Sequence, residues 1–565
     1  MLFNPTDYTR KHNDEASRAL VQATIDFFEA KGLKKLKEDD QAAVWYEDFL
    51  AFVKESGIFA THLTPAGYGP PDARWDMWRI SHFNEVLSFY GLCYWYAWQV
   101  TILGLGPFWM GDNEAAKARA AKALAEGGIL GFGLSERTHG ADIYSTEMTL
   151  HPTGDGTWVA RGEKYYIGNG NAAALISVFG KMADTGDYVF FAVEPEHEAY
   201  ELVKKIDTSG VRQAYVAEFR LNDYPITKDD ILSTGRLAWD SSLGTVNVGK
   251  FELGWASIGI CTHCLYEAIN HAANRTLYGQ QVTDFPHVRR ELVDAYARLT
   301  AMRLVGMRSA DYLRTASDED RRYLLYNPIV KMKVTSQGEQ VVALLHQIIA
   351  AKGYEQETYF EMALRDIGML AKLEGTEQVN MALVIKFMKN YFFAPADYPA
   401  VPRRDEIGDD GYLFRQFTGG LAKVRFPDYA LPYEGVELPN VHVFRGQVEL
   451  FRKLLMTAPP TPEQAKNVDF MLAGGELFTL AVYAQLILES AALDAVDDDL
   501  VDRIFDVLVR DFSGFALAMV VGHDCTPDQE LLFREMLKKP ARQPDRFSRL
   551  WATVLGLDGA YEMSE

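Results

Sequence analysis

The spacing of apolar residues changes twice along this chain, and this pattern constrains its fold more than any other feature. The first part of the chain places apolar side chains at helical spacing, as in ASRALVQATIDFFEAKGL and AAKARAAKALAEGG. The next part alternates short apolar runs with turn residues, as in TEMTLHPTGDGTWVARGEKYYIG, which is typical of strands, with GDG as a hairpin turn. Helical spacing then returns up to Lys389. We therefore expect an N-terminal helical domain at 1–125, a middle β-domain at 126–240 and a helical bundle at 241–392.

The remainder of the chain adds two further segments. Residues 393–440 hold APADYPAVPRR, FPDYALPYEG and ELPN, a proline-rich stretch too long for an ordinary loop, which we interpret as an ordered linker. Residues 441–565 return to amphipathic helical spacing and predict an additional helical domain. Within it, TPEQAKNVDF predicts a helix with Thr461 as N-cap and Pro462 in the first turn. The expected fold class is mainly α with a small β-domain.

The composition excludes some partners. With 57 basic and 78 acidic side chains the formal net charge is −21, so we expect neither nucleic acid nor an anionic membrane surface as a partner.

Four cysteines in 565 residues indicate a reducing compartment, and the polar N-terminus lacks an apolar signal segment, so we expect a cytoplasmic location. The uncharged stretch from Leu87 to Gly111 is long enough to span a bilayer, but its glycines and Pro107 favour a buried helix pair without a membrane span.

Three short motifs lie at the junctions of the expected domains, and a fourth, RTLYGQ, lies within the expected helical bundle. They are GFGLSERTHGADIYS at 131–145, GEKYYIGNGN at 162–171, RTLYGQ at 275–280, and LEGTEQVN at 373–380, which ALRD precedes at 363–366. In this order and at these spacings they resemble the acyl-CoA dehydrogenase family over roughly residues 8–395, and the extra C-terminal helices resemble those of its longer members. The resemblance implies the family's fold and an oxidation of acyl-CoA thioesters in fatty-acid β-oxidation.

Glu374 is the candidate catalytic base. Desaturation of an acyl thioester requires a carboxylate that takes the weakly acidic α-proton while hydride leaves the β-carbon for flavin N5. Glu374 is followed by Gly375 and Thr376, which permit a tight turn before a helical run; for an isolated E-G-T, a solvated helix-start glutamate is the alternative. The resemblance makes Glu374 the family's base, with its backbone N–H polarising the thioester carbonyl. Some members keep the base at the position of Gly249, which has no ionisable side chain.

The resemblance implies FAD as the cofactor. The positions that match its binding residues are Phe132, Leu134, Ser135, Tyr166, Gly168, Arg275, Tyr278, Gln347, Thr376 and Gln378. In the family, Ser135 and the surrounding backbone correspond to hydrogen-bond donors to the flavin, and Tyr166 to a ring against one flavin face. Arg275 corresponds to a partner of the pyrophosphate. Gln347, from a neighbouring subunit, and Gln378 match positions near the adenylate half.

The substrate positions of the family match Ala141, Lys250 and Gly375. Lys250 stands where the family usually has an arginine near the thioester and the CoA arm. The family also implies a soluble electron-transfer flavoprotein as electron acceptor and assembly as dimers or tetramers, from which we expect a homodimer. We predict no metal site, because Cys261 and Cys264 share a helix face without a second pair at ligand spacing.

Departures from the family leave two alternatives open. Gly168 replaces a threonine that commonly donates to flavin N5, Ala141 replaces a serine, and Ala350 and Ala351 replace a glycine pair near the pyrophosphate. These changes keep a repurposed, non-catalytic binding protein of the same fold as one alternative. An acyl-CoA oxidase that passes electrons directly to oxygen is the other, because motifs near the flavin do not separate oxidases from dehydrogenases.

Overall fold

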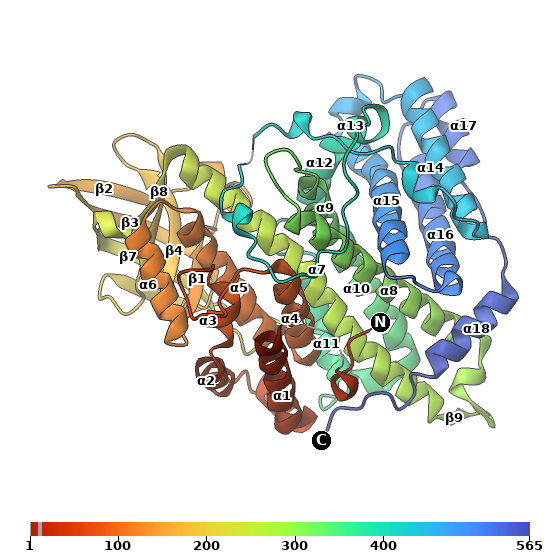
Figure 1. Ribbon diagram of the computed structural model, residues 1–565, viewed down its shortest axis with the longest axis horizontal. Helices are drawn as coiled ribbons and strands as arrows, with labels where there is room; N and C mark the ends of the chain where they lie inside the picture. Colours follow the sequence, from red (N-terminus) through yellow and green to blue (C-terminus); the bar gives the residue numbers. More distant parts are fainter. Residues whose placement is uncertain (1, 9–13, 418, 565) are drawn as a thin grey trace.

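The computed structural model describes residues 2–8, 14–417 and 419–564, and Figure 1 shows its elements along the chain. The N-terminal part consists of helices α1 (Glu15–Gln41), α2 (Glu47–Ser56), α3 (Ile58–Leu63), α4 (Met77–Tyr90), α5 (Leu92–Met110) and α6 (Glu114–Ala125). Short polar side chains at Asp14, Asp76 and Asn113 cap α1, α4 and α6. Every residue of α5 is buried, so the uncharged stretch of the sequence lies inside the protein, as the buried helix pair predicts.

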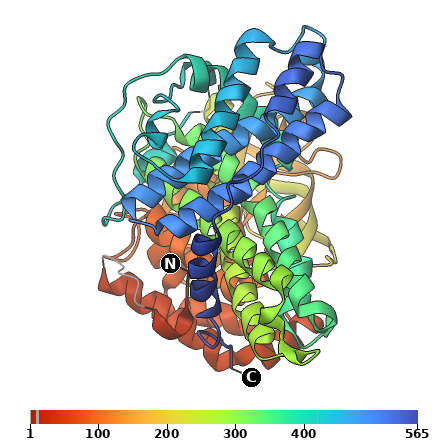
Figure 2. The same ribbon diagram turned by 90° about the vertical axis from the view of Figure 1, so that its right-hand side faces the viewer.

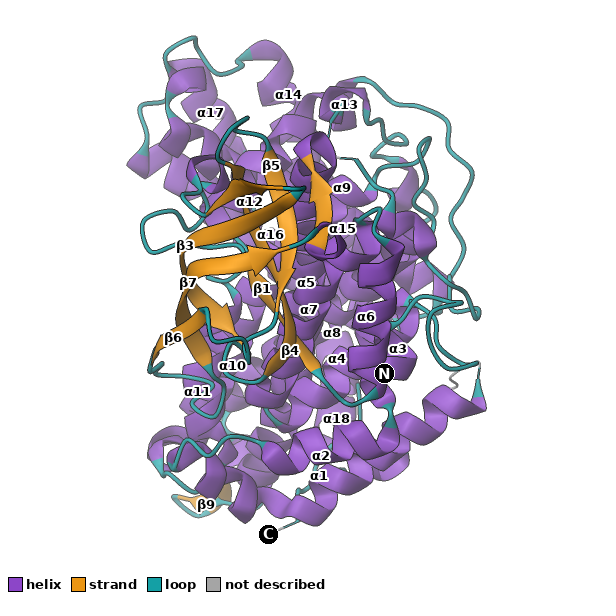
Figure 3. Cartoon of the chain, turned by 90° about the vertical axis from the view of Figure 1, so that its left-hand side faces the viewer, coloured by secondary structure: helices purple, strands orange, loops and turns teal. Residues whose placement is uncertain are grey.

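The middle part forms one twisted sheet. Its strands are β1 (Ile129–Gly133), β2 (Thr149–Gly154), β3 (Thr157–Gly168), β4 (Ala173–Met182), β5 (Tyr188–Val193), β6 (Tyr200–Lys205), β7 (Val216–Ile226) and β8 (Ile231–Thr234). The order is β6-β7-β3-β2-β4-β5-β8, and β1 pairs in parallel with β4. Asp155 and Gly156 have positive φ in the turn between β2 and β3, so the GDG hairpin is present. Figure 3 shows the sheet in front of the helices, where β1 packs on α5.

The second helical part is built around α7. Its elements are α7 (Gly235–Ala273), β9 (Thr276–Leu277), β10 (Gln280–Gln281), α8 (Pro286–Arg314), α9 (Tyr323–Ile329), α10 (Thr335–Ile349), α11 (Tyr359–Leu370), α12 (Glu377–Val384) and α13 (Met388–Phe393). A π-helical turn, Val330–Val334, joins α9 to α10. In Figure 1, α7 runs from the β-domain to the opposite end of the molecule, where β9 lies. A Cβ atom on Gly259 would lie 2.0 Å from Ser88 Oγ, so this glycine permits the close packing of α7 on α4.

The C-terminal helices are joined to the rest by the proline-rich segment. They are α14 (Pro439–Thr457), α15 (Val468–Leu493), α16 (Asp498–Gly522), α17 (Pro527–Glu535) and α18 (Pro544–Leu555). The linker forms short 3₁₀ turns and is held to α4, because the Met77 N–H donates to Asp410 at 2.7 Å. Figure 2 shows the C-terminal helices beside the helical bundle, and α15, α16 and α18 all contact α8. Arg298 on α8 forms a two-pronged pair with Asp511 on α16, at 2.7 and 2.8 Å.

The predicted fold class, mainly α with a small β-domain and extra C-terminal helices, is confirmed. The predicted start of a helix at Thr461 is wrong. The segment after Thr461 forms only a 3₁₀ turn (Gln464–Lys466), and α15 begins at Val468 because the Asn467 side chain accepts from the Phe470 N–H and caps it there. In the described part of the chain, α15 alone is long and apolar enough to cross a membrane, and 72% of its apolar window is buried in the protein.

Candidate active site

Glu374 lies in a short loop between α11 and α12. Its backbone has φ = 54° and that of Gly375 has φ = 85°, so two successive residues occupy the left-handed region. For a non-glycine residue such a conformation costs about 1–3 kcal/mol and persists only where surrounding contacts hold it. Thr376 then caps α12, with its hydroxyl accepting from the Val379 N–H. The tight turn expected for E-G-T is present, and Glu374 precedes a helix N-terminus.

Two buried lysines anchor the ends of this loop. Lys331, in the π-helical turn, donates from Nζ to the Ala371 carbonyl at 2.6 Å, where α11 ends. Lys250, on α7, donates to Asn380 Oδ1 at 3.0 Å. The Asn380 amide in turn donates to the carbonyls of the two residues that follow Glu374, both at 3.0 Å. The loop is therefore held from α7 on one side and from the π-helical turn on the other.

Glu374, Lys250 and Lys331 shift one another's pKa values. Glu374 is half-buried, and the protein around its carboxyl raises its pKa to about 7, against the lowering effect of Lys250 and Lys331. Burial lowers the pKa of each lysine to about 8, with Glu374 acting in the opposite direction. A carboxyl group with a pKa near 7 is a stronger base than a solvated glutamate and is still ionised in part at neutral pH. Glu374 is therefore not a solvated glutamate at a helix start, which was the alternative interpretation.

The neighbouring stretch of α7 offers no alternative base. A Cβ atom on Gly249 would lie 2.4 Å from Leu103 Cδ2, and Gln99 Nε2 donates to the Gly249 carbonyl at 2.9 Å. A glutamate at this position would therefore collide with α5. Glu252, three residues further along, is buried against an asparagine amide of α4, and burial raises its pKa well above the usual range. Glu374 remains the candidate base.

The end of strand β1 presents two free backbone donors. The amide N–H groups of Leu134 and Ser135 donate to no acceptor among the residues that the structure describes. Lys164, the lysine of the GEK motif, fixes this segment by donating to the Leu134 carbonyl at 3.0 Å and to Glu136 at 2.7 Å. The Ser135 hydroxyl donates to the Tyr165 carbonyl at 2.9 Å. The available donors are therefore the backbone amides rather than the hydroxyl.

A β-bulge turns Tyr166 out of the sheet. The pairing of β3 with β7 shifts between Tyr165 and Ile167, and Tyr166 has φ = 69° and is 42% exposed. Bulges of this kind re-aim side chains next to active sites. Phe132, on the adjoining strand, is buried. An exposed aromatic ring beside two free amide donors fits a flat ring that carries hydrogen-bond acceptors along one edge, which is the chemistry of a flavin.

Tyr96 links this edge of the β-domain to Glu374. It lies on α5 and is 5% exposed, and a Cβ atom on Gly168 would lie 2.8 Å from its ring Cε1. Burial and the acidic groups of Tyr166 and Glu374 raise the pKa of the Tyr96 hydroxyl. Helix α5 is also tied to the Glu374 loop through α7, because Gln99 donates to the Gly249 carbonyl and the adjacent Lys250 donates to Asn380. The end of the β-domain, helix α5 and the Glu374 loop therefore meet at one site.

Arg275, Tyr278 and Gln347 lie away from this site. Arg275 follows the far end of α7, where it contacts His271 at 3.1 Å, about 35 Å from Lys250 at 1.5 Å per helical residue. Tyr278, in the β9–β10 hairpin, is 96% exposed, and Gln347 is exposed near the end of α10. Figure 1 shows β9 at the opposite end of the molecule from the sheet. Within one chain, these predicted cofactor residues do not meet the β-domain edge.

Some predicted residues are exposed, and some residues near Glu374 were not predicted. The predicted residues Ala141, Thr376 and Gln378 are exposed. Tyr96 and Lys331 were not predicted, although a lysine inside the apolar run YNPIVKMKV is a usable signal, because buried lysines are rare and need a partner. Asn380 stands within the LEGTEQVN motif, but the sequence alone assigned it no role.

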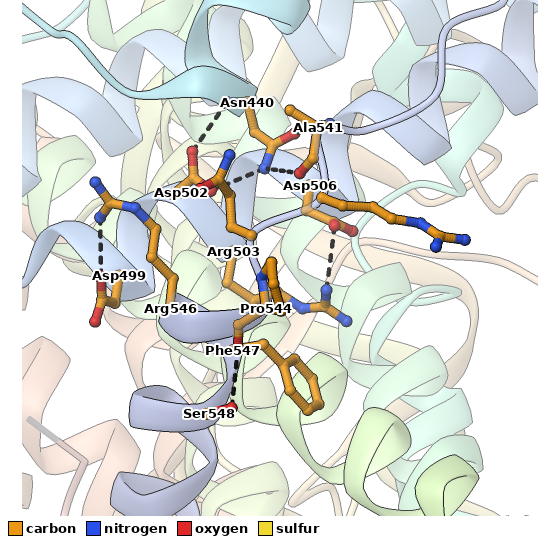
Figure 4. Close-up of a pocket in the computed structure, with 12 residues that line it drawn as sticks. Asn440, Asp499, Asp502, Arg503, Asp506, Ala541, Pro544, Arg546, Phe547 and Ser548 are labelled. Carbon is orange, nitrogen blue, oxygen red and sulfur yellow. Dashed lines mark hydrogen bonds and ion pairs between the residues drawn. The ribbon is translucent and has the colours of Figure 1, made fainter.

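A separate cleft of about 440 Å³ lies among the C-terminal helices, as Figure 4 shows. Several of its charged groups form ion pairs, Arg546 with Asp499 at 2.8 Å and Arg503 with Asp506 at 3.1 Å, and the Asn440 amide donates to Asp502 at 2.9 Å. None of the residues that surround Glu374 line it. The pairing leaves this cleft without a group suited to acid–base chemistry.

Glu136, His139 and Glu147 place potential metal-ligand atoms within 4.8 Å of one another. The Glu136 carboxylate is already paired with buried Lys164 at 2.7 Å, and Glu147 is exposed. We therefore assign no metal site to this group.

Comparison with known proteins gives matches to both parts of the site. The family model described as the acyl-CoA dehydrogenase middle domain matches residues 131–224, and the one described as the acyl-CoA dehydrogenase C-terminal domain matches residues 239–389. A short-chain specific acyl-CoA dehydrogenase of Megasphaera elsdenii is 23% identical over 386 residues, which are 67% of this chain and 98% of that protein.

Solved structures share the fold. The crystal structure of an acyl-CoA dehydrogenase complexed with FAD from Bacillus anthracis matches with a TM-score of 0.77 at 17% identity, over 98% of this chain and 96% of that one. The match therefore includes the C-terminal helices. A chain from a structure of the electron transferring flavoprotein of Acidaminococcus fermentans matches with a TM-score of 0.61 at 21% identity, over 67% of this chain and 98% of that one.

Proposed function

The chain belongs to the acyl-CoA dehydrogenase family, and from this premise we propose that it catalyses the FAD-dependent α,β-dehydrogenation of an acyl-CoA thioester with Glu374 as the base. One observation carries the proposal: the half-buried carboxyl of Glu374, whose pKa is about 7, lies at the same site as the free donors and the exposed ring of the β-domain edge. When bound, FAD accepts the hydride from the β-carbon. The protein's own residues remove the proton and orient the reactants.

Glu374 takes the α-proton on its carboxylate. At neutral pH about half of the molecules carry the ionised form, because the pKa is about 7, and Lys250 and Lys331 favour that form. The two anchors of the loop keep the carboxylate in place while the substrate binds, which lowers the entropic cost of reaching the reactive geometry. The Glu374 N–H donates to no acceptor among the described residues, so it is available to polarise the thioester carbonyl.

The β-domain edge supplies the proposed cofactor contacts. The free N–H groups of Leu134 and Ser135 would hold the acceptor edge of the flavin ring, where negative charge accumulates on reduction. Tyr166 would stack on one face of the ring, as its exposed side chain permits. Lys164 and the bulge at Tyr166 fix these groups before binding, so little rearrangement is needed.

We propose that the active form is a homodimer. Arg275, Tyr278 and Gln347 are too far from Ser135 to serve the same FAD molecule within one chain, and Tyr278 is almost fully exposed on its hairpin. In a symmetric dimer a second copy would bring its hairpin and the end of its α10 to the cofactor. The predicted pyrophosphate and adenylate contacts would then come from the partner chain.

The proposed substrate is an acyl-CoA, and the proposed electron acceptor is a soluble electron-transfer flavoprotein, in line with the Acidaminococcus fermentans structure. An acyl-CoA oxidase is the alternative. Stopped-flow reoxidation in air separates the two, because an oxidase forms peroxide rapidly and a dehydrogenase does not. The cytoplasmic location and the role in β-oxidation stay predictions.

Anaerobic titration with a panel of acyl-CoAs tests the reaction. We expect the flavin absorbance of the wild-type protein to bleach with its substrate, and the Glu374→Gln protein to retain FAD without bleaching. Glu377→Gln is the matched control, because Glu377 lies three residues away at the start of α12, and it should bleach normally. Normal bleaching in Glu374→Gln would refute Glu374 as the base. A protein that holds FAD but bleaches with no acyl-CoA would favour the non-catalytic alternative.

A further inference from the structure

Tyr96 is a buried residue whose hydroxyl is left without a partner at the site. Its side chain is 5% exposed, yet the hydroxyl makes no hydrogen bond to any residue that the structure describes. On the same helix, the Tyr94 hydroxyl and the Trp98 indole N–H are fully enclosed without a partner, whereas the Tyr96 hydroxyl is not fully enclosed by the protein. A group that binds at the site can therefore accept a hydrogen bond from it.

The position of Tyr96 is tied to the missing side chain at residue 168. A Cβ atom on Gly168 would lie 2.8 Å from Tyr96 Cε1, 2.9 Å from the Tyr96 hydroxyl oxygen and 2.6 Å from Val100 Cγ2. The end of the tyrosine side chain thus fills the space that any larger residue at 168 would enter. Tyr96 and Val100, both on α5, therefore leave no room for a side chain at residue 168, and the Tyr96 hydroxyl lies where such a side chain would begin.

The surroundings of this hydroxyl keep it protonated. Burial and the acidic groups of Tyr166 and Glu374 raise its pKa, so it stays a neutral hydrogen-bond donor at any working pH. Tyr166 presents the ring proposed to stack on the flavin, and Glu374 is the proposed base. Tyr96 therefore stands beside both the cofactor side and the substrate side of the site.

We propose that the Tyr96 hydroxyl donates a hydrogen bond to the flavin ring and so replaces the donor that Gly168 does not supply. This inference rests on the proposed function for the identity of the ligand. A donor placed where electron density accumulates favours the reduced flavin over the oxidised flavin. Tyr96 transfers no proton or electron in this role, and its effect is on the reduction equilibrium of the bound flavin.

The test is the midpoint potential of the FAD-loaded protein without acyl-CoA, measured by spectroelectrochemical titration. We expect Tyr96→Phe to disfavour reduction at least tenfold, which is a fall of about 30 mV for a two-electron couple, and to shift the visible flavin bands. Tyr46→Phe is the control, because Tyr46 has a buried hydroxyl without a partner that is enclosed in the core, and its potential should match the wild type. Equal potentials in Tyr96→Phe and wild type would overturn the proposal.

A second pair of variants tests the same idea without Tyr96. Tyr96→Ala/Val100→Ala opens the space at residue 168. Adding Gly168→Thr to this double variant places a hydroxyl there, whereas adding Gly168→Val places the same shape without a hydroxyl. We expect the threonine protein to have the higher potential, and equal potentials would overturn the proposal. Because no acyl-CoA is present, these results are independent of whether Glu374 acts as the base. If no acyl-CoA bleaches the flavin, the proposed function is refuted, but the proposed role of Tyr96 is not.

Discussion

Replacement of Glu374 by glutamine should stabilise the folded protein at alkaline pH while it stops proton abstraction. Burial raises the pKa of this carboxyl from 4.5 to about 7 on folding. A group whose pKa is raised on folding contributes stability below its unfolded pKa, and that contribution is lost as the pH rises through the folded pKa. At pH 8 the native site therefore holds a poorly solvated charge that the unfolded chain exposes to water.

The magnitude follows from the two pKa values. One pKa unit corresponds to about 1.4 kcal/mol, so Glu374→Gln should be more stable than the wild type by about 3 kcal/mol at pH 8. At pH 5 the native carboxyl is protonated and the unfolded one is only partly ionised, so the difference should fall below about 1 kcal/mol. Glutamine is close to the protonated carboxyl in size, so the packing of the loop should not change.

Thermal unfolding at a series of pH values from 5 to 8 measures this difference. Wild type and variant are compared with the same FAD occupancy and without acyl-CoA, since ligands that bind only the native state also raise the melting temperature. Glu55→Gln, at an exposed position of α2, should stay within about 0.5 kcal/mol of the wild type throughout. A Glu374→Gln protein that gains no stability at pH 8, or gains as much at pH 5, would refute the assignment of a desolvated carboxyl.

Two further predictions concern the anchors of the loop and of the C-terminal helices. Lys331→Met removes a cation that favours ionised Glu374, so the pKa of this carboxyl should rise by about one unit or more. The lower pH midpoint of kcat/KM should then move upward with activity recovering at alkaline pH, and an unmoved midpoint would contradict the coupling. Arg298→Ala leaves the Asp511 carboxylate without its two-pronged partner, which should cost about 3 kcal/mol. Urea unfolding and limited proteolysis of residues 441–565 check this, and unchanged resistance would contradict it.

The elements that were predicted correctly depend on residues that are adjacent in the sequence. The GDG turn needs only residues that tolerate positive φ, and the strands on each side need only an alternating pattern. The E-G-T turn at Glu374 is a similar case, because a glycine after the glutamate and a capping threonine are adjacent in the sequence. The wrong helix start at Thr461 shows the limit of such reasoning. Asn467 is an equally good N-cap six residues later, and the packing of α15 decides between them.

The rest of the site depends on contacts between residues far apart in the chain. Lys331 donates to a carbonyl that is 40 residues away in the sequence, and Lys250 donates to Asn380, which is 130 residues away. No local pattern predicts such pairs, although a lysine inside an apolar run indicates that a partner exists. Similarly, Arg275 matched a family motif, but the motif does not say how far the arginine lies from the rest of the site. That question is set by the length and direction of α7.

The departures from the family pattern have different structural outcomes. Ala350 stands where the family has glycine, yet it keeps φ = 58° with ψ = −140°, a backbone conformation that glycine favours. For a non-glycine residue such a conformation is strained and persists only where surrounding contacts hold it. At Gly168 the local side chain is lost, and a tyrosine from α5 enters the same space. The alanine thus keeps a glycine-like backbone conformation at residue 350, and a tyrosine hydroxyl lies beside Gly168. Sequence departures at these positions are therefore weak evidence for lost activity.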